Sequence, residues 1–130
     1  MSTTSLSSVS AISLFAEDLA ACRQFYTTVF GVEVVYEDAT SVAVKFGSLI
    51  VNLLDVRSAH ELVGEGNVAG SGAGARFQLS IWVPDVNAEC ARLASLGVSL
   101  RGPEDKPWGM RAATFTDPAG NSWEVAQKLG

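Results

Sequence analysis

The sequence contains the same pattern twice, and this internal repeat constrains the fold more than any other feature. Residues 11–19 read Ala-Ile-Ser-Leu-Phe-Ala-Glu-Asp-Leu, and residues 78–86 read Gln-Leu-Ser-Ile-Trp-Val-Pro-Asp-Val. Each copy alternates with the period of a strand and then reaches an aspartate that suits a helix N-cap. Half a fold of about 60 residues buries little apolar surface alone, so we expect the two copies to pack together.

The first copy predicts one strand, one helix and three further strands. Apolar residues recur after Asp18 at spacings of three and four, as in an amphipathic helix, and Gly31 is a suitable helix end. Short alternating segments separated by turns follow. The predicted strands are 11–16, 33–37, 42–46 and 49–54.

The second copy predicts the same series. Asp85 caps a helix that Gly97 ends, and the turn Asp117-Pro118-Ala119-Gly120 joins the last two strands. The predicted strands are 78–83, 98–101, 110–116 and 121–126, with a longer loop over 102–109. Five glycines lie among the small residues of 58–75, which predicts a flexible connector without a helix or strand. We therefore expect a single domain over 1–130, with module 1 at about 9–57 and module 2 at about 76–127.

Composition excludes several classes of function. The net charge is −5 and the nine basic residues are scattered, so no nucleic-acid surface is predicted. No apolar run reaches the roughly 18 residues that span a bilayer. Met1–Ser8 lacks the basic and apolar parts of a secretory signal and is expected to be a frayed lead-in to the first strand. Cys22 and Cys90 are expected to be buried small hydrophobes in a cytoplasmic protein.

Several segments resemble one known family, the vicinal oxygen chelate superfamily of glyoxalases, bleomycin-resistance proteins and extradiol dioxygenases. The resemblance covers about 9–127 and implies an α+β fold in which two βαβββ modules form a curved sheet around a ligand cleft. The segments that carry it are Asp18-Leu19, Phe25-Tyr26, Phe30-Gly31-Val32, Lys106-Pro107-Trp108-Gly109-Met110-Arg111 and Asp117-Pro118-Ala119-Gly120-Asn121 with Glu124.

The resemblance also implies four positions that bind a divalent metal in the family's enzymes. Counting seven residues back from each capping aspartate places two of them at Ala11 and Gln78. The last-strand position is Glu124, and the remaining one falls at Val51 or Asn52. Alanine cannot bind a metal, so only Gln78 and Glu124 remain as metal ligands if any metal binds. Catalytic sites usually supply three protein ligands, and no cofactor is therefore predicted.

The strand patterns suggest a ligand-binding face without reference to the family. One side of each first strand is aliphatic, whereas the other mixes small, polar and aromatic groups, as a small-molecule pocket requires. Phe15 and Trp82 occupy equivalent places and could hold a planar ligand between them; the alternative is that they fill a core or a dimer interface. The candidate ligand-binding residues are Ser13, Phe15, Gln78, Ser80, Trp82, Trp108, Arg111 and Glu124.

Glu124 is the candidate catalytic residue. A carboxylate on a partly apolar face needs a partner, and the candidates are a ligand, Arg111 or a metal. The alternative is that Glu124 faces water at the edge of the sheet. The alternation of side chains along its strand does not show whether Arg111 faces the cleft. Trp108 lies in a loop where it is expected to cover the mouth of the pocket. His60, the only histidine, is expected to be solvated in the connector, and Tyr26 is expected in the core.

The leading functional hypothesis is metal-free binding of a small aromatic or drug-like ligand, as the resemblance to the bleomycin-resistance branch implies, in a homodimer. A second hypothesis is a lyase, isomerase or dioxygenase that uses Gln78 and Glu124 with a divalent metal, or Glu124 alone as a base. A third is a regulatory or assembly module with a vestigial pocket. A serine nucleophile is not supported, because the sequence has no Gly-x-Ser-x-Gly motif.

Overall fold

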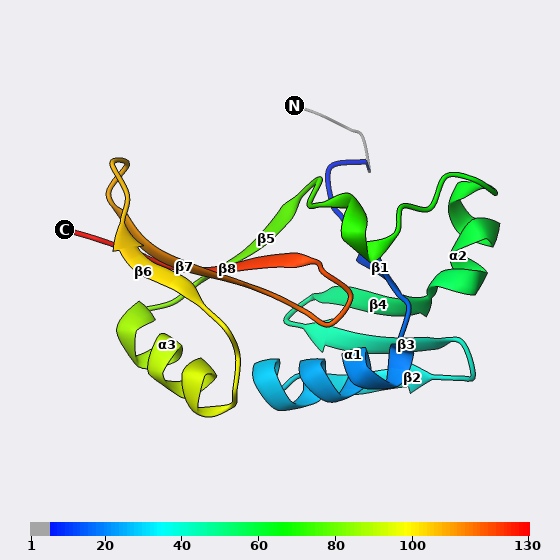
Figure 1. The fold of residues 1–130 in the computed structure, drawn as a ribbon, viewed down its shortest axis with the longest axis horizontal. Helices are drawn as coiled ribbons and strands as arrows, with labels where there is room; N and C mark the ends of the chain where they lie inside the picture. The colour runs from blue at the N-terminus through cyan, green and yellow to red at the C-terminus, as the bar shows by residue number, and fades with distance from the viewer. Residues whose placement is uncertain (1–5) are drawn as a thin grey trace. The chain divides into compact units, whose positions relative to one another are not determined.

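A computed structural model describes residues 6–130, which divide into two compact units at Ala69 and Gly70. Each unit is a βαβββ module with its own four-stranded sheet, so the fold is α+β as the repeat predicted (Figure 1). The expectation for Met1–Ser8 lies in part outside the described residues. Within 6–130, every helix is too short or too polar to cross a lipid bilayer.

The sheet of the first unit has the order β1-β4-β3-β2, and β1 is parallel to β4. Short turns make the other two pairs antiparallel. The elements are β1 (Ala11–Ala16), α1 (Leu19–Phe25), a π-helical turn (Tyr26–Phe30), β2 (Glu33–Glu37), β3 (Ser41–Phe46), β4 (Leu49–Asp55) and α2 (Val56–Val63).

The predicted limits of the first long helical segment are confirmed. The Asp18 carboxylate accepts a hydrogen bond from the Ala21 amide at 3.0 Å, which caps α1. Gly31 ends the segment with a φ of +65°, a conformation that costs glycine no side-chain clash. Tyr26 is fully buried and packs against the rings of Phe30 and Phe46, so it belongs to the core.

The second unit repeats this layout with the sheet order β5-β8-β7-β6, in which β5 is parallel to β8. The Asp85 carboxylate caps α3 by accepting from the Ala88 amide at 3.0 Å. The elements are a short 3₁₀ turn (Ser71–Ala73), β5 (Gln78–Trp82), α3 (Val86–Ser95), β6 (Arg101–Asp105), β7 (Met110–Thr116) and β8 (Ser122–Lys128).

The helix α1 packs against β3 and β4 of the first sheet, and α3 packs against β6, β7 and β8 of the second sheet (Figure 1). In the second unit this side of the sheet carries the buried Trp123 and Val125, and α3 contributes Leu93. Cys22 and Cys90 are buried, as predicted, and neither forms a disulfide. Burial raises the pKa of the Cys90 thiol.

The expectation that 58–75 holds no regular element is wrong, because α2 extends over Val56–Val63. Asp55 caps this helix by accepting from the Arg57 amide at 2.9 Å, and its carboxylate also pairs with the Arg57 guanidinium at 2.7 Å. Ala59 is fully buried. The helix has only eight residues, and the glycines that follow from Gly64 hid it in the sequence pattern.

The second strand of the second unit, β6, lies later than predicted, at Arg101–Asp105 instead of 98–101. The Gly102–Pro103 pair was interpreted as the start of a loop, but it lies inside the strand at a shift in register between β6 and β7. Gly102 has a φ of +96°, and a Cβ there would lie 2.8 Å from the Ala112 carbonyl oxygen. Glycine is therefore required where β6 passes close to β7.

Candidate functional site

The register of the second sheet decides which side chains face away from α3. Gln127 on β8 accepts a hydrogen bond from the Val86 amide at the start of α3, so Gln127, Val125 and Trp123 share the helix side. Alternate residues share the other side, which we call the open face of the second sheet. Its members are Gln78, Ser80 and Trp82 on β5, Ser122, Glu124 and Ala126 on β8, Ala112, Thr114 and Thr116 on β7, and Arg101 and Glu104 on β6.

One row of four polar residues crosses this open face. Ser80, Glu124, Thr114 and Arg101 lie opposite one another on successive strands. The Ser80 hydroxyl donates to Glu124 Oε1 at 2.8 Å, which fixes the direction of the carboxylate. The predicted residues Ser80 and Glu124 are therefore in direct contact.

A second polar pair lies next to this row. Gln78 Nε2 donates to the Ser122 hydroxyl at 2.9 Å, and Ser122 lies opposite Thr116. Gln78 and Glu124 thus share a face and belong to neighbouring rows, so the structure brings the two predicted polar candidates to the same end of the sheet.

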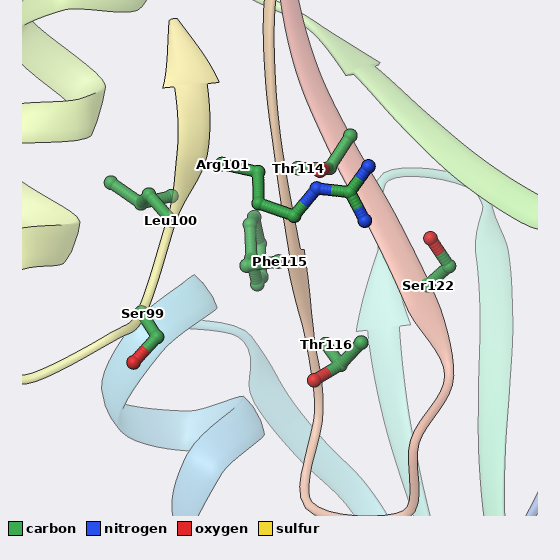
Figure 2. Close-up of a pocket in the computed structure, with 7 residues that line it drawn as sticks. All are labelled: Ser99, Leu100, Arg101, Thr114, Phe115, Thr116 and Ser122. Atoms are coloured by element: carbon green, nitrogen blue, oxygen red, sulfur yellow. The ribbon is translucent and has the colours of Figure 1, made fainter.

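A pocket of about 210 Å³ opens beside these rows. Figure 2 shows the Arg101 side chain extending from β6 across β7, with its guanidinium beside Thr114 and directed toward β8. Hydroxyl groups and two apolar side chains form the rest of the lining, which consists of Ser99, Leu100, Thr114, Phe115, Thr116 and Ser122.

Two exposed tryptophans lie on different parts of the second unit. The Trp82 residue is 73% exposed on the open face, one row along from Ser80 and Glu124. The Trp108 residue is 69% exposed in the turn between β6 and β7, where the Lys106 amide donates to the Met110 carbonyl. Because Met110 begins β7 and Thr116 ends it, Trp108 lies at the opposite end of β7 from the pocket.

Arg111 does not lie on the open face. Its register partners are Gln127 and Asp105, which place it on the helix side with Phe115. Its guanidinium pairs with the Asp105 carboxylate at 2.7 Å and lowers the pKa of that group. The structure therefore does not join Arg111 to Glu124, and Arg101 supplies the guanidinium of the open face. The sequence pattern did not identify Arg101. The alternation of side chains along one strand does not show which residue of the neighbouring strand lies opposite.

The first sheet has an equivalent open face with different side chains. Ser13 lies opposite Asn52, as Ser80 lies opposite Glu124. Val51 is 1% exposed and lies opposite Ile12 on the helix side. Asn52, not Val51, is therefore the counterpart of Glu124. Phe15 takes the position equivalent to Trp82, opposite Leu54, and His60 is exposed on α2.

The side chains present do not fit a divalent metal. Among the four positions that the family resemblance implies, Glu124 supplies the single carboxylate, and Ala11 supplies no ligand atom. Asn52 and Gln78 are neutral amides, and the Gln78 amide nitrogen already donates to Ser122. Over residues 6–130, no three His, Cys, Asp or Glu side chains come together in an arrangement that could hold a metal ion. One carboxylate with two amides falls short of the usual donor set.

Comparison with known proteins gives one family and several related structures. The family model described as "Glyoxalase/Bleomycin resistance protein/Dioxygenase superfamily" matches residues 8–125. No curated protein sequence matches this chain significantly.

The similar solved structures include proteins with different stated roles. An antibiotic-binding protein, TnmS3 from Streptomyces sp. CB03234, is 27% identical with a TM-score of 0.74, over 96% of this chain and 98% of that one. A lactoylglutathione lyase from Agrobacterium tumefaciens is 26% identical with a TM-score of 0.76, over 95% of this chain and 96% of that one. A protein from Nocardioides, described by the family's name, is 24% identical with a TM-score of 0.86, over 98% of this chain and 87% of that one, and supports the fold alone.

Proposed function

The chain belongs to the Glyoxalase/Bleomycin resistance protein/Dioxygenase superfamily, and from this premise we propose that it binds a small aromatic or drug-like ligand without a metal. The observation that carries the proposal is the open face of the second sheet. An exposed indole, Trp82, lies there one row along from the fixed Glu124 carboxylate, and a pocket lined by hydroxyl groups opens on the other side of that carboxylate. An aromatic surface with a few oriented polar groups is the usual composition of a small-molecule site.

Each group on this face has a distinct role in the proposal. Trp82 stacks on a planar ligand and excludes water from one side of it. Glu124, oriented by Ser80, accepts a hydrogen bond from a donor on the ligand. Gln78 and Ser122 supply further polar contacts at the same end of the sheet. Antibiotics are a suitable first class of ligand, because one similar structure is described as an antibiotic-binding protein.

An enzymatic role for Glu124 is the second candidate. The favouring observation is that its carboxylate accepts a hydrogen bond from Ser80 on the open face and, within residues 6–130, forms no ion pair. In that role Glu124 would remove a proton from a bound ligand without a metal, as a general base. Turnover of a bound ligand that Glu124→Gln abolishes while binding persists would establish this role.

The assembly and cellular location belong to the same proposal. The family resemblance supports a homodimer, which light scattering tests directly; a monomeric mass would contradict it. Two free, buried cysteines support a reducing compartment, and hence the cytoplasm. A net charge of −5 supports a protein that does not bind nucleic acid.

The first experiment measures metal content and ligand binding on the same protein. The protein is purified without chelators or a metal-affinity tag, analysed for metals, and titrated with Mn²⁺, Fe²⁺, Ni²⁺ and Zn²⁺. The variant Glu124→Ala is compared with Glu65→Ala, which alters an exposed glutamate in the loop after α2. We expect no stoichiometric metal, and quenching of tryptophan fluorescence by aromatic antibiotics that a chelator does not change.

The contradicting result is equally specific. Near-stoichiometric metal in the wild type and in Glu65→Ala, lost in Glu124→Ala, would overturn the metal-free proposal and favour a metalloenzyme. An absence of both metal and any quenching across the antibiotic series would favour the regulatory or assembly module instead.

A further inference from the structure

The pocket beside the open face contains a cationic group that the proposed function does not yet use. Arg101 is exposed at the start of β6, and its guanidinium extends over β7 beside Thr114 (Figure 2). Within residues 6–130, no carboxylate pairs with Arg101. The nearby carboxylate on the same strand, Glu104, is paired with Lys106 at 2.6 Å, which lowers the pKa of Glu104 most; Arg101 lowers this pKa to a smaller extent, from beyond ion-pair distance.

The pocket around this guanidinium presents hydroxyl groups that can donate to an anion. Thr114 lies directly opposite Arg101, and Thr116 and Ser122 lie opposite each other in the next row. Guanidinium groups recognise carboxylates and phosphates with two parallel hydrogen bonds, and hydroxyls add further donors. Leu100 and the buried Phe115 form the apolar part of the lining, so a molecule that carries the anion on an apolar body has a surface to contact.

The carboxylate of Glu124 lies in the same row as Arg101 and opposes the binding of an anion there. Thr114 separates Glu124 from Arg101 in the row, so their backbones are two strand spacings, about 10 Å, apart. The guanidinium extends from β6 over β7 toward β8 (Figure 2), so an anion bound to it lies nearer to Glu124 than the Arg101 backbone does, and its paired hydrogen bonds to the guanidinium must outweigh repulsion by Glu124. The row therefore offers an acceptor at one end and a cationic donor at the other.

From this arrangement we propose that Arg101 forms an anion subsite, and that the ligand is an aromatic molecule carrying a carboxylate or similar acidic group. The proposal rests on the proposed function, because the aromatic body would lie on the same open face. The net negative charge of the chain therefore does not indicate a cationic ligand, because the charged group that lines this pocket is the positive guanidinium of Arg101.

The test uses two probes of the same shape and different charge. Naphthoate and the corresponding naphthamide, of the same naphthalene isomer, are titrated against the wild type, Arg101→Gln and Arg101→Lys, with tryptophan fluorescence as the readout. Arg92→Gln is the control, because it removes one positive charge from the same unit on the exposed side of α3. Circular dichroism establishes that each variant folds.

We expect the wild type and Arg92→Gln to prefer naphthoate by about tenfold, as a charge-assisted contact in a part-enclosed site allows. Arg101→Gln removes that preference and leaves the naphthamide affinity within about twofold, while Arg101→Lys retains part of the preference because the charge remains. Added salt reduces the preference in every protein that keeps a positive charge at position 101, and has no preference to reduce in Arg101→Gln.

The outcomes separate this inference from the proposed function. Equal binding of both probes, or a preference that survives Arg101→Gln, would overturn the anion subsite and leave aromatic binding intact. If neither probe nor any aromatic antibiotic binds at millimolar concentration, the proposed function fails, and the anion subsite fails with it.

Discussion

The two sheets share one backbone plan but differ on their open faces. In the first sheet, Ser13 lies opposite Asn52 and then Ala43. In the second sheet, the equivalent row is Ser80, Glu124, Thr114 and Arg101. The helix sides, in contrast, are both closely packed. The helix sides are therefore alike, whereas Asn52 and Tyr36 of the first sheet lie at the positions equivalent to the charged Glu124 and Arg101 of the second sheet.

The substitutions with the largest expected effect compare how much the helix side of each sheet contributes to the free energy of unfolding. Trp123 is 3% exposed and Leu53 is 1% exposed. We predict that Trp123→Ala lowers the free energy of unfolding by about 3–5 kcal/mol and Leu53→Ala by about 2–5 kcal/mol, since each leaves a cavity. Urea unfolding measures both.

The matched control is Trp82→Ala on the open face, which should change the free energy of unfolding by less than about 1 kcal/mol because Trp82 is mostly exposed. A loss as large as that of Trp123→Ala would show that the open face has been misassigned.

The second prediction compares equivalent aromatic residues on the two open faces. Trp82→Ala should weaken naphthoate binding by about tenfold, because stacking and buried area are both lost. Phe15→Ala should change it by less than about twofold if the second sheet binds the ligand alone. Fluorescence or calorimetric titration measures both affinities, and equal losses would assign the ligand to both faces.

The third prediction compares the two residues at equivalent row positions. Glu124→Gln should weaken binding of a hydroxynaphthoate by about threefold to fivefold, because the amide is a poorer acceptor for the ligand hydroxyl. Naphthoate, which lacks that hydroxyl, should bind the variant at least as tightly, because repulsion by the Glu124 carboxylate is removed, and Asn52→Ala should leave both affinities unchanged. If Asn52→Ala weakened ligand binding and Glu124→Gln did not, the ligand would be assigned to the open face of the first sheet instead of the second.

The smallest effect concerns acid stability, where the first unit holds the two most strongly shifted carboxyls. The pKa of Asp38 is lowered from 3.8 to about 2, first by the Thr40 amide and then by the Tyr36 and Ser41 hydroxyls. The pKa of Asp55 is lowered to about 2, first by the Arg57 side chain. A folded-state pKa below the unfolded value stabilises the fold above about pH 4.

This stabilisation should be lost as the pH falls from about 4 to about 2. Asp38→Asn should therefore flatten the pH dependence of the urea midpoint across that interval, at the cost of lower stability at neutral pH. An unchanged slope in Asp38→Asn would show that its hydrogen bonds do not persist in solution.

Much of the fold follows from local sequence signals. The caps Asp18 and Asp85, the helix end at Gly31 and the strands 11–16 and 110–116 are at their predicted places, because each depends on neighbours in the chain. The short helix α2 was not predicted, and β6 was predicted at the wrong residues. Both depend on contacts that are distant in sequence: the burial of Ala59, and the close approach of Gly102 to β7.

The candidate site was predictable only in part for the same reason. Parity placed Ser80, Trp82 and Glu124 on one face of their strands, and the structure brings them together. The alternation of side chains does not give the register between β6 and β7. Arg111 was therefore predicted to be a ligand-binding residue, whereas Arg101 is the arginine that lies on the open face. Strand register is set across the sheet, and a shift by one residue exchanges the two faces.

The central claim is that the open face of the second sheet binds an aromatic ligand without a metal. Mapping of backbone amide chemical shifts during a naphthoate titration, in the presence of a metal chelator, tests it most directly. The account predicts shifts concentrated at Ser80, Trp82, Thr114 and Glu124, with Ser13, Ala43 and Asn52 unaffected. Shifts centred on the first sheet, or shifts that appear only after a divalent metal is restored, would contradict it.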